Sequence, residues 1–100
     1  MLSKIPIDLQ KIKPEEIDKE IIRSAIIAEL DAINLYEEMA ALAKNKLIRT
    51  VLLDVAEEEK EHVGEFQTLL LTFDKEQEKA SEKGKKEVED LTTSLRKGQR

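Results

Sequence analysis

Two stretches of the chain place apolar residues at alternating steps of four and three, the spacing of one helix face. The first row is Ile22, Ile26, Glu29, Ile33, Tyr36, Ala40 and Ala43, and the second is Ile48, Leu52, Val55, Glu59, His62, Phe66, Leu69 and Phe73. Pro14 suits a helix start, and Asn45 suits a turn because asparagine tolerates the left-handed conformation that ends many helices. The pattern predicts helices from about Pro14 to Lys44 and from about Leu47 to Asp74. One uninterrupted helix across residue 45 is the alternative.

The segments on either side of these helices have a different character. Residues 1–13 contain Pro6 and scattered apolar residues, which indicates a lead-in segment. Residues 75–86 are strongly charged and contain Gly84, which predicts a connector or a frayed helix, and Glu87 to Leu95 predicts a short final helix. The expected fold is therefore all-α: a lead-in (1–13), an antiparallel two-helix hairpin (14–74), and a charged connector with a short C-terminal helix (75–100).

Three polar residues, Glu29, Glu59 and His62, interrupt the two apolar rows. Carboxylates and imidazoles are costly to bury unless they are paired, hydrogen-bonded or bound to a metal. In an antiparallel hairpin, residues equally distant from the turn lie at the same height, and Glu29 mirrors the Glu59–His62 pair about a point near residue 45. Because this point is the predicted turn, we expect the three side chains to face one another at one level.

Two carboxylates and an imidazole are ligands that suit iron or manganese, and also zinc. The di-iron bundles of ferritin-like proteins use one Glu from each of two helices and a Glu-x-x-His pair from each of the other two. This chain carries half of that set, and a two-helix hairpin does not enclose its own apolar rows. The prediction is an obligate homo-oligomer in which a dimer forms a ferritin-like four-helix bundle with a two-metal site on its two-fold axis. A metal-free structural hairpin with a buried ion-paired layer is the alternative.

Composition narrows the classes of partner. A net charge of −5 gives no support for nucleic-acid binding, which needs a basic surface. The absence of cysteine excludes disulfides, thiolate metal sites and iron–sulfur ligation. No apolar run approaches the length of a membrane span, and no signal peptide opens the chain. We expect a cytoplasmic protein with neither nucleic acid nor membrane as a partner.

Around the candidate ligands, the sequence resembles the encapsulated ferritins, a branch of the ferritin-like family. The resemblance covers about residues 21–71 and is carried by AELDAINLY at residues 28–36, by EEEKEH at residues 57–62, and by the spacing between them. It implies a ferroxidase that oxidises Fe(II) to Fe(III) at a di-iron centre in the dimer interface of a decameric ring. It further implies that Glu29 of each chain bridges the two irons, that Glu59 and His62 cap one iron each, and that Tyr36 lies beside the centre.

The sequence departs from some members of this family in two places. Leu35 stands where they have a tryptophan, and Ala28 replaces one of two outer acidic residues, whereas Asp31 keeps the other. An outer metal site is therefore in doubt. A rubrerythrin-like peroxide scavenger with the same centre is the alternative enzyme, weakened by the lack of a cysteine-ligated electron-transfer site.

The resemblance also implies iron storage or detoxification inside an encapsulin shell, because a ring of such chains encloses no sealed cavity. Family members reach the shell by fusion or through a short C-terminal peptide. The tail DLTTSLRKG at residues 90–98 resembles such a peptide, although it is one residue short and lacks the usual glycine before the serine. A short amphipathic helix is the alternative. The expected location is the cytoplasm, within an encapsulin nanocompartment.

Overall fold

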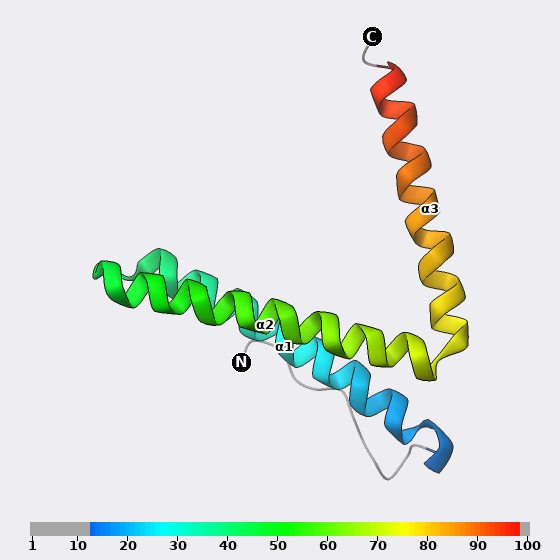
Figure 1. Ribbon diagram of the computed structural model, residues 1–100, viewed down its shortest axis with the longest axis horizontal. Coiled ribbons are helices and arrows are strands. Elements are labelled where there is room, and N and C mark those ends of the chain that lie inside the picture. The colour runs from blue at the N-terminus through cyan, green and yellow to red at the C-terminus, as the bar shows by residue number, and fades with distance from the viewer. Residues whose placement is uncertain (1–12, 99–100) are drawn as a thin grey trace.

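The computed structural model describes residues 13–98, which form one short 3₁₀ helix and three long α-helices (Figure 1). The 3₁₀ helix η1 (Pro14–Glu16) leads into α1 (Ile17–Leu42), which is followed by α2 (Lys46–Phe73) and α3 (Lys75–Gly98). The helices α1 and α2 lie side by side as an antiparallel hairpin, and α3 projects away from them. The predicted all-α hairpin is confirmed, and a single helix across residue 45 is wrong. Apart from Lys13, the predicted lead-in lies outside the described residues.

The turn lies where the sequence predicts it, but Asn45 acts in a different way. Its backbone is extended, with φ −81° and ψ 128°, and its side chain accepts a hydrogen bond of 3.0 Å from the Ile48 N–H. Asn45 is thus the N-cap of α2, and the prediction that it ends the first helix in a left-handed conformation is wrong. A side-chain acceptor at this position satisfies an N–H group that has no partner within the helix. The guanidinium of Arg49 donates to the carbonyl of Ala43 at 2.6 Å, which places a cation at the end of α1.

The apolar layer between α1 and α2 is thin. The buried apolar residues from α1 belong to the predicted row, whereas those from α2 do not, and together they are Ile22, Ile33, Ala40, Ala56 and Leu70. The predicted row of α2 is only partly covered: Ile48, Leu69 and Phe73 are 55%, 43% and 59% exposed. That row is therefore exposed at both ends of α2, so the hairpin covers only part of the surface that the sequence pattern assigns to a core.

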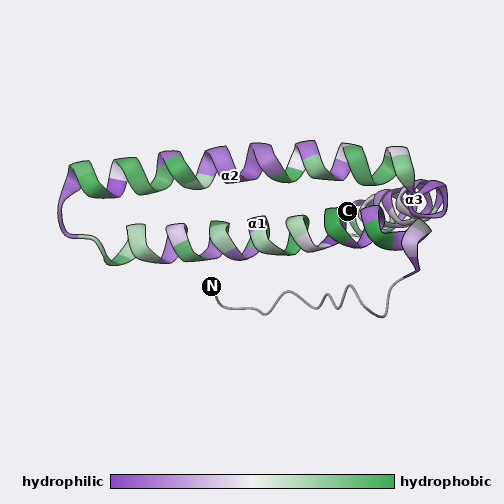
Figure 2. Cartoon of the chain, turned by 90° about the horizontal axis from the view of Figure 1, so that it is seen from below, coloured by the Kyte–Doolittle hydropathy of each residue, from purple (hydrophilic) through white to green (hydrophobic). Residues whose placement is uncertain are grey.

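Residues 75–98 form one continuous helix, where the sequence predicts a connector and a short helix. Glutamate and lysine are good helix formers, and Gly84 alone costs only about 1 kcal/mol relative to alanine, so the helix continues through it. The helix has no buried residue, and Figure 2 shows it as mostly hydrophilic. Its large apolar residues, Val88, Leu91 and Leu95, are 63%, 63% and 67% exposed.

The molecule has an elongated, bent shape. It measures 54 × 46 × 19 Å, and its radius of gyration of 17.8 Å exceeds the roughly 13 Å of a compact chain of 100 residues. Its accessible surface of 8189 Å² also exceeds the roughly 5800 Å² expected for a compact monomer of 11.5 kDa. The fold therefore leaves a large area without intramolecular contacts. None of the helices within residues 13–98 has the length and apolar character that a membrane span requires.

Candidate metal centre

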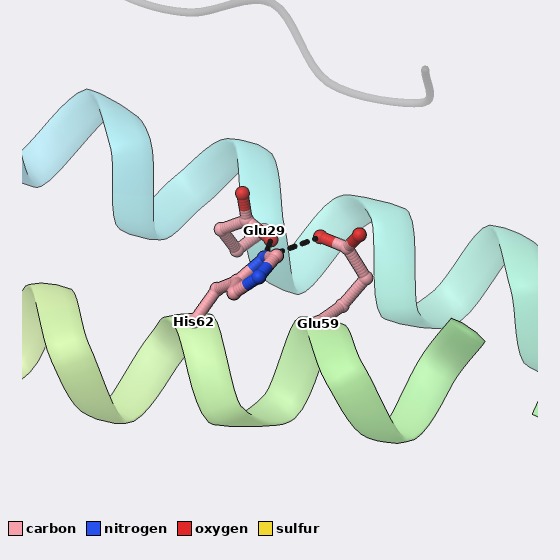
Figure 3. A group of neighbouring side chains, drawn as sticks. All are labelled: Glu29, Glu59 and His62. Carbon is pink, nitrogen blue, oxygen red and sulfur yellow. Dashed lines mark hydrogen bonds and ion pairs between the residues drawn. The ribbon is translucent and has the colours of Figure 1, made fainter. Parts of the chain in front are cut away.

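One carboxylate of α1 meets a carboxylate and an imidazole of α2 in the middle of the hairpin (Figure 3). The Nδ1 atom of His62 lies 3.3 Å from an Oε atom of Glu29 and 3.5 Å from an Oε atom of Glu59. One ligand atom from each of the three residues can be chosen so that all lie within 4.8 Å of one another. The shared level expected from the hairpin geometry is present. The role of these residues as metal ligands stays a prediction.

The three side chains differ in how far they are shielded. The side chains of Glu29 and Glu59 are 21% and 19% exposed, whereas that of His62 is 43% exposed. The two helices thus shield the carboxylates more than the imidazole, which is the most exposed of the three side chains. Nδ1 carries at most one proton, and one N–H does not align well with two carboxylate acceptors. The cluster therefore holds more acceptor capacity than its own donor satisfies.

The spacing of the cluster suits one cation. Nitrogen and carboxylate oxygen ligands lie about 2.0–2.2 Å from a first-row ion such as zinc, so two ligands of one ion lie at most about 4.4 Å apart. The 4.8 Å limit of the cluster is only slightly wider, so small rotations of the glutamate side chains would bring the atoms to binding distance. Carboxylates and an imidazole suit iron, manganese and zinc. The residues present therefore fit the predicted metal.

Tyr36 does not join this cluster. It lies on the face of α1 that carries Glu29 but two turns further along, which is about 10 Å along the helix axis. Its side chain is partly buried, and its hydroxyl makes no hydrogen bond within the described residues. Its place beside a di-iron centre stays a prediction, because that centre would form only between two copies of the chain.

Asp31, which the resemblance assigns as an outer acidic residue, is buried. It is only 8% exposed, and it makes a polar interaction of its own. With Ala28 in place of the other acidic residue, the pair of outer acids seen in some encapsulated ferritins has no exposed member here. The exposed acidic residues nearest in sequence to the cluster are instead Glu57, Glu58 and Glu61 of α2.

Two ion pairs between elements were not predicted. The Lys60 ammonium lies 3.0 Å from the Glu37 carboxylate across the hairpin, next in sequence to the candidate ligand Glu59. Both partners are largely exposed, so the pair contributes less than about 1 kcal/mol. The second pair joins Arg23 to Asp74, which are 51 residues apart. No sequence pattern links those two residues, although an aspartate directly before a charged helical stretch is a recognised capping signal.

Comparison with known proteins agrees with this geometry. The sequence profile of the rubrerythrin family matches residues 20–97, which include all three candidate ligands. The chain belongs to the rubrerythrin family. A solved structure of the encapsulated ferritin domain from Pyrococcus furiosus superposes on this rubrerythrin-family chain with a TM-score of 0.78 at 49% sequence identity. That match covers 93% of this chain and 95% of the other, which confirms both the resemblance to encapsulated ferritins and the ferritin-like fold.

A curated relative extends the comparison. The ferritin-like-encapsulin shell fusion protein of Pyrococcus furiosus is 54% identical over 95 residues. The match covers 92% of this chain but only 27% of that protein's length. The likeness therefore concerns one part of a longer relative.

Proposed function

We propose that the protein is a ferroxidase that oxidises Fe(II) to Fe(III) at a di-iron centre shared by two copies of the chain. The observation that carries the proposal is the convergence of Glu29, Glu59 and His62 within 4.8 Å at one level of a hairpin. Ferritin-like di-iron bundles hold two such sets, and one hairpin supplies one of them. A second copy related by a two-fold axis supplies the other.

The surface of the hairpin supports the pairing of two copies. His62 is the most exposed candidate ligand, and the α2 row to which it belongs has the exposed members Ile48, Leu69 and Phe73. Further large apolar residues are exposed on the hairpin, among them Leu30, Met39, Leu47, Val51 and Leu53. A chain with this much uncovered apolar surface gains stability when a second copy covers it. By resemblance to the encapsulated ferritins, the full assembly is a decameric ring.

In this proposal, the side chains bind the substrate iron and favour its oxidised state. Glu29 of each chain bridges two ions, Glu59 and His62 cap one ion each, and Tyr36 lies beside them, as in the family that the chain resembles. Anionic carboxylates stabilise the higher charge of Fe(III) more than that of Fe(II), which lowers the free energy of oxidation. Two Fe(II) ions together pass two electrons to dioxygen, which takes up two protons and becomes hydrogen peroxide, or to hydrogen peroxide, which takes up two protons and becomes two water molecules. Fe(III) then leaves for storage elsewhere.

The test is an anaerobic Fe(II) titration followed by oxygen, monitored by the absorbance of Fe(III). Glu59→Gln should lower the initial rate by at least about tenfold, because even the outer partners of metal ligands cost 10- to 100-fold when they are changed. Glu58→Gln is a matched control, since Glu58 is the exposed neighbour of Glu59 on the same helix. Equal rates for the two variants would show that the cluster is not the oxidation site.

A rubrerythrin-like peroxide scavenger is a second candidate, favoured by the family whose profile matches residues 20–97. The two activities separate when the Fe(II)-loaded protein receives either oxygen or anaerobic hydrogen peroxide. A ferroxidase consumes its iron with either acceptor and leaves Fe(III) as product, whereas a scavenger turns over peroxide repeatedly when an electron donor is supplied. A metal-free hairpin would bind no iron under either condition.

We further propose that the protein works inside an encapsulin shell, where the oxidised iron is stored or detoxified. The curated relative supports this proposal because its name joins a ferritin-like part to an encapsulin shell. The expected location is the shell interior in the cytoplasm. Residues 90–98, which resemble a shell-addressing peptide, lie at the end of α3 with Leu91 and Leu95 exposed.

Truncation after Glu89 tests the role of this tail. The truncated and the full chain are each co-expressed with an encapsulin shell protein, and the shells are isolated. We expect only the full chain to co-purify with the shell, because the truncation removes the exposed leucines. Equal recovery of both chains would assign the tail to a plain amphipathic helix.

A further inference from the structure

The boundary between α2 and α3 has a capping residue, Asp74, but no residue that would forbid a continuous helix. Only Asp74 separates the two helices. Residues 69–80 read LLLTFDKEQEKA, a run without glycine or proline. Apart from Thr72, Phe73 and Asp74, these residues are good helix formers. Local propensity therefore permits both a continuous helix and an interrupted one, and a contact from elsewhere can favour the bend in Figure 1.

The Asp74 side chain makes two contacts that the backbone ladder of a straight helix does not include. Its Oδ1 atom accepts a hydrogen bond of 3.0 Å from the Gln77 N–H. Its Oδ2 atom accepts a hydrogen bond of 2.7 Å from the Arg23 guanidinium of α1. The hydrogen bond of 3.0 Å from the Glu78 N–H to the Asp74 carbonyl, by contrast, is an ordinary helical bond between residues four apart. Asp74 is only 5% exposed, which is less than the 8% of Asp31, the other buried charged residue in the part of the chain that the structure describes. We call Arg23, Asp74 and Gln77 the elbow latch.

The residues of the latch have different contacts in a bent and in a straight arrangement of α2 and α3. In the bent form, the Asp74 side chain caps the start of α3 while its charge is paired with Arg23. In a straight form, the backbone groups around residue 74 would pair within one long helix, and the Arg23 guanidinium would lose its partner. Phe73 is 59% exposed and α3 has no buried residue, so apolar packing contributes little to the choice.

We propose that the elbow latch is a conformational lock that keeps α3 bent away from the axis of α2. The lock sets the direction in which α3 presents Val88, Leu91 and Leu95. When the latch is removed, α2 and α3 join into one helix from residue 46 to residue 98. The proposal rests on the contacts of Asp74 and does not depend on iron chemistry or on a shell.

The two forms differ in a distance that is measurable on the assembled protein. Asp54 in α2 and Lys86 in α3 are both exposed. In a continuous helix, 32 residues of rise would separate them by about 48 Å, and any bend between them shortens this distance. The chain has no cysteine, so Asp54→Cys and Lys86→Cys provide two unique positions for nitroxide spin labels.

The experiment is pulsed electron–electron double resonance on the doubly labelled chain, diluted with unlabelled wild-type chain so that distances between copies are suppressed. In the otherwise unchanged protein, we expect one narrow distribution well below 48 Å. Arg23→Gln and Asp74→Ala should each add a population near 48 Å without loss of helical circular dichroism. Asp74→Asn keeps a capping side chain but loses the charge, and should give a smaller long-distance population. Glu76→Gln is the control, because it removes an exposed carboxylate of the same helix.

The outcomes decide the proposal in either direction. If Arg23→Gln and Asp74→Ala leave the short distance unchanged while helicity is retained, the latch does not set the bend and the proposal is wrong. A label-to-label distance near 48 Å in the protein with Arg23 and Asp74 unchanged would also overturn the proposal. If Asp74→Ala fails to fold, Arg23→Gln carries the test alone, since Arg23 is 44% exposed at its side chain and its replacement by glutamine leaves no cavity in the apolar layer.

Discussion

Asp74 is a carboxylate whose ionised form the fold stabilises. The Gln77 N–H is the main cause of its lowered pKa, and the positive charges of Arg23 and Lys19 lower the pKa further, whereas burial opposes them. An aspartate with a lowered pKa in the folded chain stabilises the fold at pH values above its ordinary pKa of about 4. That contribution is lost as the pH falls through the folded pKa.

The pH dependence of Asp74→Asn tests this assignment. At pH 7 the variant should unfold at a lower urea concentration than the wild type, because it lacks the charge that pairs with Arg23. The difference between the two proteins should shrink as the pH falls below about 4, since the wild-type carboxylate then becomes protonated. Urea unfolding at pH 7, 5, 4 and 3, at one protein concentration, measures the difference. A gap that stays constant over this range would contradict the ion pair, and Glu76→Gln should change stability by less than about 0.5 kcal/mol at pH 7.

At the same scale, the candidate ligands were predictable and the latch was not. Glu29, Glu59 and His62 interrupt apolar rows, and a polar residue in an apolar row is visible in a sequence without a structure. Arg23 and Asp74 break no pattern, because charged residues are expected on exposed helix faces. Their contact depends on the angle between elements, which no local spacing encodes.

At the scale of elements, Asn45 shows how one side chain defines a helix start. Its amide oxygen accepts from the Ile48 N–H at 3.0 Å, while the Ala43 N–H donates to Met39 and closes α1. The two helices can therefore end and begin within three residues, since their terminal groups have partners. This short connection keeps α1 and α2 in the register that brings the three candidate ligands together.

Asn45→Ala should destabilise the hairpin by about 1 kcal/mol, because it removes the N-cap acceptor of α2. Chemical unfolding monitored by circular dichroism at fixed protein concentration measures the loss. Asn34→Ala is the control: Asn34 is exposed within α1, and alanine there should be neutral or stabilising by up to about 0.5 kcal/mol. Equal stability changes in the two variants would show that the cap contributes nothing.

At the scale of the whole molecule, the hairpin is incomplete in two related ways. The apolar row of α2 is only partly covered, and the metal-ligand set is half of a ferritin-like set. Both concern one face of α2, since His62 belongs to the row that contains the exposed residues Ile48, Leu69 and Phe73. A two-fold partner on this face would cover the exposed row and complete the set together.

Mixed assemblies test whether two chains share one site. Wild-type and His62→Ala chains are co-expressed in ratios determined by mass spectrometry, and the rate of Fe(II) oxidation per chain is measured. If each site needs an intact half from both chains, activity follows the square of the wild-type fraction, so an equal mixture keeps roughly a quarter of it. If wild-type and His62→Ala proteins are purified separately and mixed in equal amounts without exchange of chains, the mixture should keep roughly half of the wild-type rate per chain. A linear dependence in the co-expressed protein would place each active site within one chain.

The sequence by itself determined the helices, the position of the turn and the level at which Glu29, Glu59 and His62 meet. Spacing along a helix is a local property, and a hairpin with a short turn converts it into height. Only the tertiary structure decided how each helix is rotated, which left the apolar row of α2 half open and buried Asp31. It also shows the contact at the bend between Asp74 and Arg23, 51 residues away, which no local spacing encodes.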